Sequence, residues 1–128
     1  MIQPNQFRVL CIEDNAILSR MLKDVLGGEG YAVETATDGE KALAEIAKNP
    51  QRFHLLITDG KTPRFDGRRL IADARAANFG GKIIVFSGCF TPKDQEELRK
   101  SQVDALLDKP GSVQELLGVV RAIHAATD

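Results

Sequence analysis

His54-Leu55-Leu56-Ile57-Thr58-Asp59 is the stretch that decides the fold, because it is a short apolar run that ends in a single carboxylate. Its length suits a buried strand, and the glycine and proline residues that follow predict an immediate turn after Asp59. Burial penalises a charged group that nothing compensates. We therefore expect other parts of the chain to supply that compensation, and Asp59 to be a functional residue.

Segments typical of strands and of helices alternate five times along the chain. Each apolar strand segment is followed by apolar positions three and four residues apart, as in a helix. This alternation predicts an α/β fold, with parallel strands joined by right-handed helical crossovers. The expected strands are residues 7–12, 31–36, 54–59, 82–87 and 104–108. The expected helices are residues 17–26, 38–48, 70–77, 91–102 and 112–123, with ends uncertain by a few residues.

The first and fourth expected helices differ in how much apolar surface they offer. The fourth is mostly charged, and Leu98 is its only large apolar residue before Val103. Low burial implies low local stability, so we expect this helix to be the most mobile. The first has apolar residues at helical spacing along its length, namely Ile17, Leu18, Met21, Leu22, Val25 and Leu26.

Length and composition indicate one small domain. The 128 residues suit a single domain over 1–128, with flexible ends at about 1–6 and 125–128. The net charge of −1 gives no overall attraction to nucleic acid or to membranes. No apolar run reaches the length of a membrane span, and the first residues lack a signal-peptide core. Cys11 and Cys89 have no metal-binding spacing, which fits a reducing compartment, so we expect a cytoplasmic domain.

Polar residues follow the ends of four of the expected strands. Glu13 and Asp14 follow the first, Asp59 ends the third, Ser87 ends the fourth and Lys109 follows the fifth. The carboxyl ends of parallel strands meet at one edge of the sheet, where such folds bind their ligands. In the strand order 2-1-3-4-5, strands one and three are neighbours, which brings Asp14 close to Asp59.

Three carboxylates at this range repel one another. At about 5 Å and an effective dielectric constant of about 20, each pair costs roughly 3 kcal/mol. A divalent cation removes that cost, and carboxylates with retained waters favour a hard ion such as Mg²⁺. Asp59 could then act as a carboxylate nucleophile toward a phosphoryl group. Ser87 could donate a hydrogen bond to a phosphoryl oxygen, and Lys109 could pair with it as a cation.

Over essentially its full length, the sequence resembles the receiver domains of two-component response regulators. The resemblance implies a CheY-like (flavodoxin-like) sheet of order 2-1-3-4-5 with helices on both faces. It also implies that the domain accepts a phosphoryl group from a sensor histidine kinase or a histidine phosphotransfer protein, and then switches its binding to a downstream protein. The residues that carry the resemblance are Glu13-Asp14, Asp59, Pro63, Asp66-Gly67, Ser87-Gly88 and Lys109-Pro110.

The same resemblance implies a role for each site residue. Asp59 would be the phosphoacceptor, and Ser87 and Lys109 would contact the phosphoryl group. Asp14 would bind Mg²⁺, or Mn²⁺ in its place, and Glu13 would bind the ion through water. The domain would phosphorylate itself as a signal, without multiple-turnover enzyme activity, and would bind neither nucleic acid nor membrane directly.

Departures from the family pattern keep other functions open. Leu106 stands where the family usually has Tyr or Phe in the fifth strand, and Thr62 stands where Met is common. These residues leave a phosphorylation-independent interaction module as the alternative. Lys61, whose backbone carbonyl the resemblance assigns to the metal, stands where phosphohydrolases of this type carry a second Asp, so turnover of that kind is disfavoured. A flavodoxin is disfavoured because the acidic loop after the first strand suits a cation and not a phosphate.

The two histidines of the chain carry no recognisable motif. Neither His54 nor His124 is near a cysteine or the other histidine in the sequence. We interpret both as surface or edge residues and not as ligands.

Overall fold

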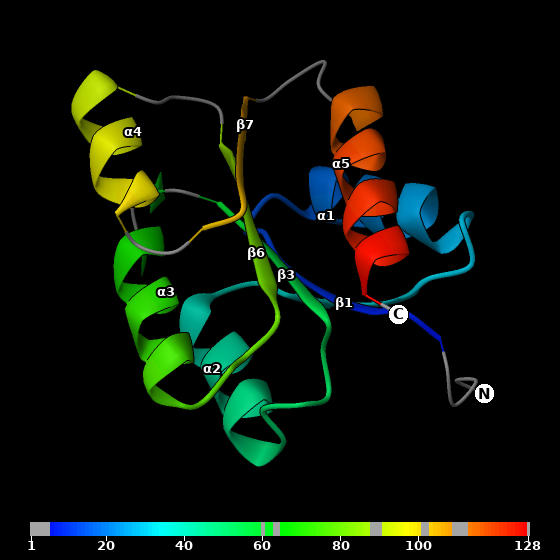
Figure 1. Cartoon of the computed structure of the whole chain (residues 1–128), viewed down its shortest axis with the longest axis horizontal. Helices are drawn as coiled ribbons and strands as arrows, with labels where there is room; N and C mark the ends of the chain where they lie inside the picture. Colours follow the sequence, from blue (N-terminus) through cyan, green and yellow to red (C-terminus); the bar gives the residue numbers. More distant parts are fainter. Residues whose placement is uncertain are drawn as a thin grey trace.

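The computed structural model describes residues 6–59, 61–62, 65–87, 91–100, 103–108 and 113–127, and a five-stranded sheet lies at the centre of the fold (Figure 1). Its strands are β1 (Arg8–Ile12), β2 (Ala32–Ala36), β3 (Leu55–Thr58), β6 (Lys82–Ser87) and β7 (Ala105–Asp108). They lie in the order β2-β1-β3-β6-β7, and each neighbouring pair is parallel. The predicted order 2-1-3-4-5 is confirmed, because β6 and β7 are the fourth and fifth strands of this sheet along the chain.

Helices cover both faces of the sheet, as predicted. They are α1 (Ala16–Gly27), α2 (Gly39–Lys48), α3 (Gly67–Ala76), α4 (Pro92–Arg99) and α5 (Val113–Ala126). Figure 1 shows α2, α3 and α4 on one face and α1 and α5 on the other. Where the sequence predicted only a turn after β3, β4 (Lys61–Thr62) pairs antiparallel with β5 (Phe65–Asp66). Among the described residues, none of the helices is both long and apolar enough to cross a bilayer.

Each face of the sheet has its own hydrophobic core, because successive residues of a strand point to opposite faces. In β1, Val9 and Cys11 belong to the core shared with α1 and α5, whereas Leu10 and Ile12 belong to the core shared with α2, α3 and α4. All four side chains are buried. Burial on both faces explains why the strand segments read as continuous apolar runs and not as alternating ones.

Side-chain caps determine where α1 and α2 begin. The N–H of Leu18 donates to Asn15 Oδ1 at 3.0 Å, and the N–H of Lys41 donates to Asp38 Oδ1 at 2.8 Å. Each cap satisfies an N–H group that has no partner within its helix. Because Asn15 caps α1 immediately after β1, the turn that holds Glu13 and Asp14 is short.

The apolar residues at helical spacing in α1 divide into buried and exposed ones. Ile17 and Met21 are 84% and 39% exposed, whereas Leu22 and Leu26 are buried. At about 100° per residue, the apolar positions of this helix spread over roughly half of its circumference, which is wider than the strip that faces the sheet. Ile17 and Met21 therefore lie on the outer flank.

In α4, Leu98 is buried as predicted, but the helix ends at Arg99, before the predicted end near residue 102.

Candidate functional site

Three carboxylates converge at the carboxyl edge of the sheet. Glu13 and Asp14 follow β1, and Asp59 follows β3, the strand beside it. The pairing of Ile12 with Thr58 places Glu13 and Asp59 each one residue beyond the paired ends. One side-chain oxygen from each of the three residues lies within 4.8 Å of the others. The structure therefore brings together the acidic residues that the sequence predicted to meet.

Burial differs among the three acids. Glu13 is only 4% exposed, Asp59 is half-buried and Asp14 is exposed. The backbone N–H of Glu13 donates to the Ala36 carbonyl at 3.0 Å, and its Oε2 accepts the Asn15 N–H at 3.2 Å. These contacts fix Glu13 from β2 and from the α1 cap. The position of Asp59 directly after β3 places its carboxylate beside those of Glu13 and Asp14.

Two neighbours support this arrangement, and the sequence analysis missed both. Thr58 is buried, and its Oγ1 donates to the Asp59 carbonyl at 3.0 Å, which fixes the backbone at the end of β3. Asn15 caps α1 and also donates its N–H to Glu13. A cap at Asn15 was readable from its place before a helical apolar run. The Thr58 contact has no comparable signal, because a Thr in a buried strand is ordinary.

The remaining predicted site residues lie only partly within the described part of the chain. Ser87 ends β6 two residues beyond Val85, the partner of Thr58, so its backbone is at the same edge as Asp59. The backbone of Lys61 lies in β4, two residues after Asp59. Lys109 follows Asp108, which pairs with Ser87, but Lys109 itself lies outside the described residues.

Cys11 lies next to this edge, on β1, but the structure makes it unsuitable for chemistry. Burial, together with the smaller effect of the negative charge of Glu13, raises the pKa of the Cys11 thiol to about 12. A thiol with such a pKa carries almost no thiolate at neutral pH. Cys11 is therefore a core residue, as predicted. Cys89 lies outside the described residues.

The donor set suits a hard cation. Carboxylate oxygens within 4.8 Å of one another can share one ion whose oxygen ligands lie at about 2.0–2.6 Å. Such oxygens favour Mg²⁺, Ca²⁺ or Mn²⁺ over softer metals. The donor set of the cluster therefore fits a divalent cation held beside the carboxylate of Asp59.

The fold and the acidic cluster define a class of protein, and the chain belongs to it: the response regulator receiver domain family, whose model matches residues 9–121. The chain is 32% identical over 118 residues to the transcriptional regulatory protein RprY of Bacteroides fragilis. The matched region covers 92% of this chain and 49% of RprY. The chain is 30% identical over 102 residues to the sensor histidine kinase RcsC of Escherichia coli, covering 80% of this chain and 10% of RcsC. Among solved structures, the receiver domain of the Francisella response regulator 1452 is 27% identical, with a TM-score of 0.85 over 96% of this chain and 100% of that one.

These comparisons make the chain a signalling domain of the two-component type, as the sequence predicted. The chain spans about half the length of RprY and a tenth of RcsC, so it corresponds to one part of each. Leu106, at the position that is usually aromatic in the family, is half-buried and packs against the core on the α4 side of the sheet.

Proposed function

We propose that this receiver domain accepts a phosphoryl group on Asp59 in a reaction that requires Mg²⁺. The observation that carries the proposal is the convergence of Glu13, Asp14 and Asp59 within 4.8 Å at the carboxyl edge of the sheet. Crowded carboxylates are unfavourable unless a cation neutralises them, so their placement is most simply explained by a ligand. Asp59 is the acceptor because it is a half-buried acid at the end of the central strand β3.

In the transfer, an oxygen of the Asp59 carboxylate attacks the phosphorus atom of a phosphohistidine. The P–O bond forms as the P–N bond breaks, and the departing imidazole keeps the electron pair and takes up a proton. A Mg²⁺ ion held by Glu13, Asp14 and Asp59 would supply positive charge that offsets the charge of the phosphoryl oxygens. The product is an aspartyl-phosphate, and each domain takes one phosphoryl group.

The other site residues hold the reacting groups in place. Asp14 is the proposed direct metal ligand, Glu13 acts through water, and Lys61 offers its backbone carbonyl. Ser87 donates a hydrogen bond to a phosphoryl oxygen, because its strand lies next to β3 and ends at the same edge. Lys109 pairs with the phosphoryl group as a cation.

The proposed partners follow from the chemistry. The phosphodonor is the phosphohistidine of a sensor histidine kinase or of a histidine phosphotransfer protein, and a downstream protein reads the phosphorylated state. One observation favours a second function: Leu106 lacks the aromatic ring that usually reports phosphorylation in this family. A receiver-fold module that binds its partner without phosphorylation is therefore the alternative.

Intact mass spectrometry after incubation with acetyl phosphate tests the proposal. We expect the wild-type protein to gain one phosphoryl group with Mg²⁺ and none with EDTA, and Asp59→Asn to gain none. Asp73→Asn is the matched control, since Asp73 is an exposed acid on α3 paired with Arg69, and it should be modified like the wild type. Equal modification of wild type and Asp59→Asn would refute the assignment, and a lack of any modification would favour the alternative.

A further inference from the structure

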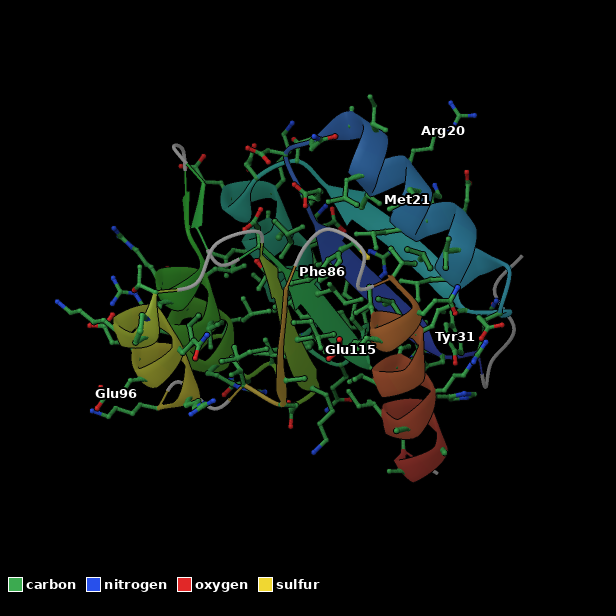
Figure 2. All side chains as sticks on the ribbon, turned by 90° about the horizontal axis from the view of Figure 1, so that it is seen from above. Arg20, Met21, Tyr31, Phe86, Glu96 and Glu115 are labelled. Carbon is green, nitrogen blue, oxygen red and sulfur yellow. The ribbon has the colours of Figure 1, made fainter. Side chains whose placement is uncertain are left out.

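A cluster of rings occupies the amino edge of the sheet, opposite the acidic site. Phe7, which directly precedes β1, contacts both histidines: the ring centroids lie 5.1 Å apart for His54 and 4.9 Å apart for His124. Tyr31, beside α5 in Figure 2, completes the group through edge contacts with Phe7 and His124. We call these four residues the amino-edge cluster. His54 is partly exposed and His124 is exposed, in line with their interpretation as surface or edge residues, and the structure adds that both lie against Phe7.

His54 is held in one protonation state by its hydrogen bonds. The backbone N–H of Arg8 donates to His54 Nδ1 at 3.0 Å, so Nδ1 carries no proton and the neutral ring has its proton on Nε2. The backbone of His54 is fixed as well: its N–H donates to the Arg8 carbonyl at 2.9 Å, and its carbonyl accepts the Lys82 N–H at 3.0 Å. The ring therefore has no freedom to turn Nδ1 away without losing its stack on Phe7.

We propose that the amino-edge cluster is a proton-sensitive latch, in which neutral His54 holds Phe7 in place for the last turn of α5 and protonated His54 releases it. Protonation at Nδ1 converts the acceptor of the Arg8 N–H into a second donor, and two donors cannot share one hydrogen bond. The ring must then shift from its place between Arg8 and Phe7. Because His124 packs on the same Phe7 ring, that shift loosens the end of α5.

The charges on the surrounding elements also oppose a positive charge on His54. Burial lowers the pKa of His54, and the positive charges of Arg8 and His124 lower it further. Acids on the neighbouring elements pair with other groups: Asp104 lies 3.7 Å from Lys82 on the β6 side, and Glu29 pairs with Arg121 of α5. Among the described residues, the other titratable groups around the cluster are Arg52, which pairs with Glu34 and Glu45, and Tyr31, whose pKa is raised by burial so that its phenol stays neutral.

The pKa shift sets the pH range and the direction of the switch. The pKa of His54 in the folded protein lies below its ordinary value of 6.5. Above pH 6.5, His54 is neutral in both the latched and the released state, so the latch is closed. As the pH falls below 6.5, the released state takes up the proton first, and latching weakens.

The end of α5 has space into which it can move. A hollow of about 430 Å³ lies beside His54, and Ala126 and Thr127 at the end of α5 form part of its wall. Within the last turn, the Thr127 N–H donates to the His124 carbonyl at 3.1 Å, and the turn is tied to the rest of the fold by His124, which packs on Phe7 and Tyr31, and by Ile123, which packs on the core. Because His124 is one of these ties, the loss of its Phe7 contact loosens this turn.

An NMR titration from pH 8 to pH 5 tests the latch. The chain has only two histidines, so their ring signals can be assigned by comparison with the variants His54→Asn and His124→Gln. We expect the His54 ring signals to titrate with a midpoint below pH 6.5, and the Arg8 amide signal to shift with the same midpoint. Below that midpoint, the amide exchange rate of residues 123–127, corrected for intrinsic rates, should rise about threefold or more. The Asn side chain keeps an acceptor for the Arg8 N–H but does not titrate, so His54→Asn should lose the pH dependence. A His54 midpoint at or above 6.5, or a corrected exchange rate in residues 123–127 that is the same at pH 8 and pH 5, would overturn the proposal. The NMR measurement needs no phosphorylation, so its result tests the latch independently of the proposed function.

Discussion

The two edges of the sheet use the same two strands for opposite purposes. β1 follows Phe7 and ends before Glu13, and β3 follows His54 and ends before Asp59. At the amino edge, these strands carry packed rings and backbone hydrogen bonds; at the carboxyl edge, they carry acids within 4.8 Å of one another. Packing at one edge stabilises the fold that holds repelling charges together at the other. A well-packed region beside a region of repelling charges is typical of proteins in which a functional site lowers the free energy of unfolding.

The largest expected effect is at the amino edge. Phe7 is buried and contacts three other rings, so Phe7→Ala should lower the free energy of unfolding by about 3–5 kcal/mol in urea denaturation. Ile17→Ala is the control, since Ile17 is an exposed apolar residue and its loss should change stability by less than about 0.5 kcal/mol. Similar losses for the two variants would remove the contrast between the edges.

Mg²⁺ should bind at the carboxyl edge and raise the free energy of unfolding, because it offsets the repulsion among the three carboxylates. A ligand at a hundred times its dissociation constant stabilises the folded state by about 2.7 kcal/mol, so urea denaturation of the wild type should shift by that order in saturating Mg²⁺. Asp14→Asn should lose most of this gain, whereas Phe7→Ala should keep it. An equal gain in Asp14→Asn and wild type, at matched ionic strength, would argue against a metal site in the acidic cluster.

The helices α4 and α5, which follow the neighbouring strands β6 and β7, should differ in local stability. α4 begins at the carboxyl edge and is anchored by Leu98, with a pair between Arg68 and Glu97 on its surface. α5 buries Leu116, Leu117 and Val120. At pH 7.5, hydrogen exchange in α4 should be about tenfold faster than in the middle of α5, because fewer apolar contacts must break to open it. Equal protection of the two helices would contradict this expectation.

The smallest expected effect is a gain in stability from removing the phosphoacceptor. Without Mg²⁺, Asp59→Asn should raise the free energy of unfolding by about 1 kcal/mol, the lower end of the repulsion per pair near 5 Å, because water screens the exposed carboxylate of Asp14. Asp73→Asn should instead leave stability nearly unchanged, because its partner Arg69 is exposed. A loss of stability in Asp59→Asn would mean that the carboxylate makes a structural contact that outweighs the repulsion.

The sequence predicted the carboxyl edge better than the amino edge, for a physical reason. Parallel strands collect their carboxyl ends at one edge, so Glu13, Asp14 and Asp59 could be placed together from strand positions alone. Likewise, the β-branched run of β6 predicted its bounds, Lys82–Ser87, as the structure has them. The hairpin of β4 and β5 carries no such pattern and was read only as a turn.

The amino-edge cluster could not be predicted in the same way. Its members, Phe7, Tyr31, His54 and His124, come from four separate parts of the chain, and their contacts depend on side-chain packing. Tertiary packing also decides which apolar residues of α1 face the core, because periodicity alone does not separate the exposed Ile17 and Met21 from the buried Leu22 and Leu26. Patterns along the chain predict elements and their ends; they do not predict which rings meet.

The central claim, that Asp59 is the phosphoacceptor of the carboxyl edge, is tested most directly by chemical trapping. The protein is incubated with acetyl phosphate and Mg²⁺, reduced with borohydride, which converts an aspartyl-phosphate to an alcohol, and then mapped by peptide mass spectrometry. We predict reduction at Asp59 alone, and none when EDTA replaces Mg²⁺. Reduction at Asp14, at Glu13 or at any acid other than Asp59 would contradict the account.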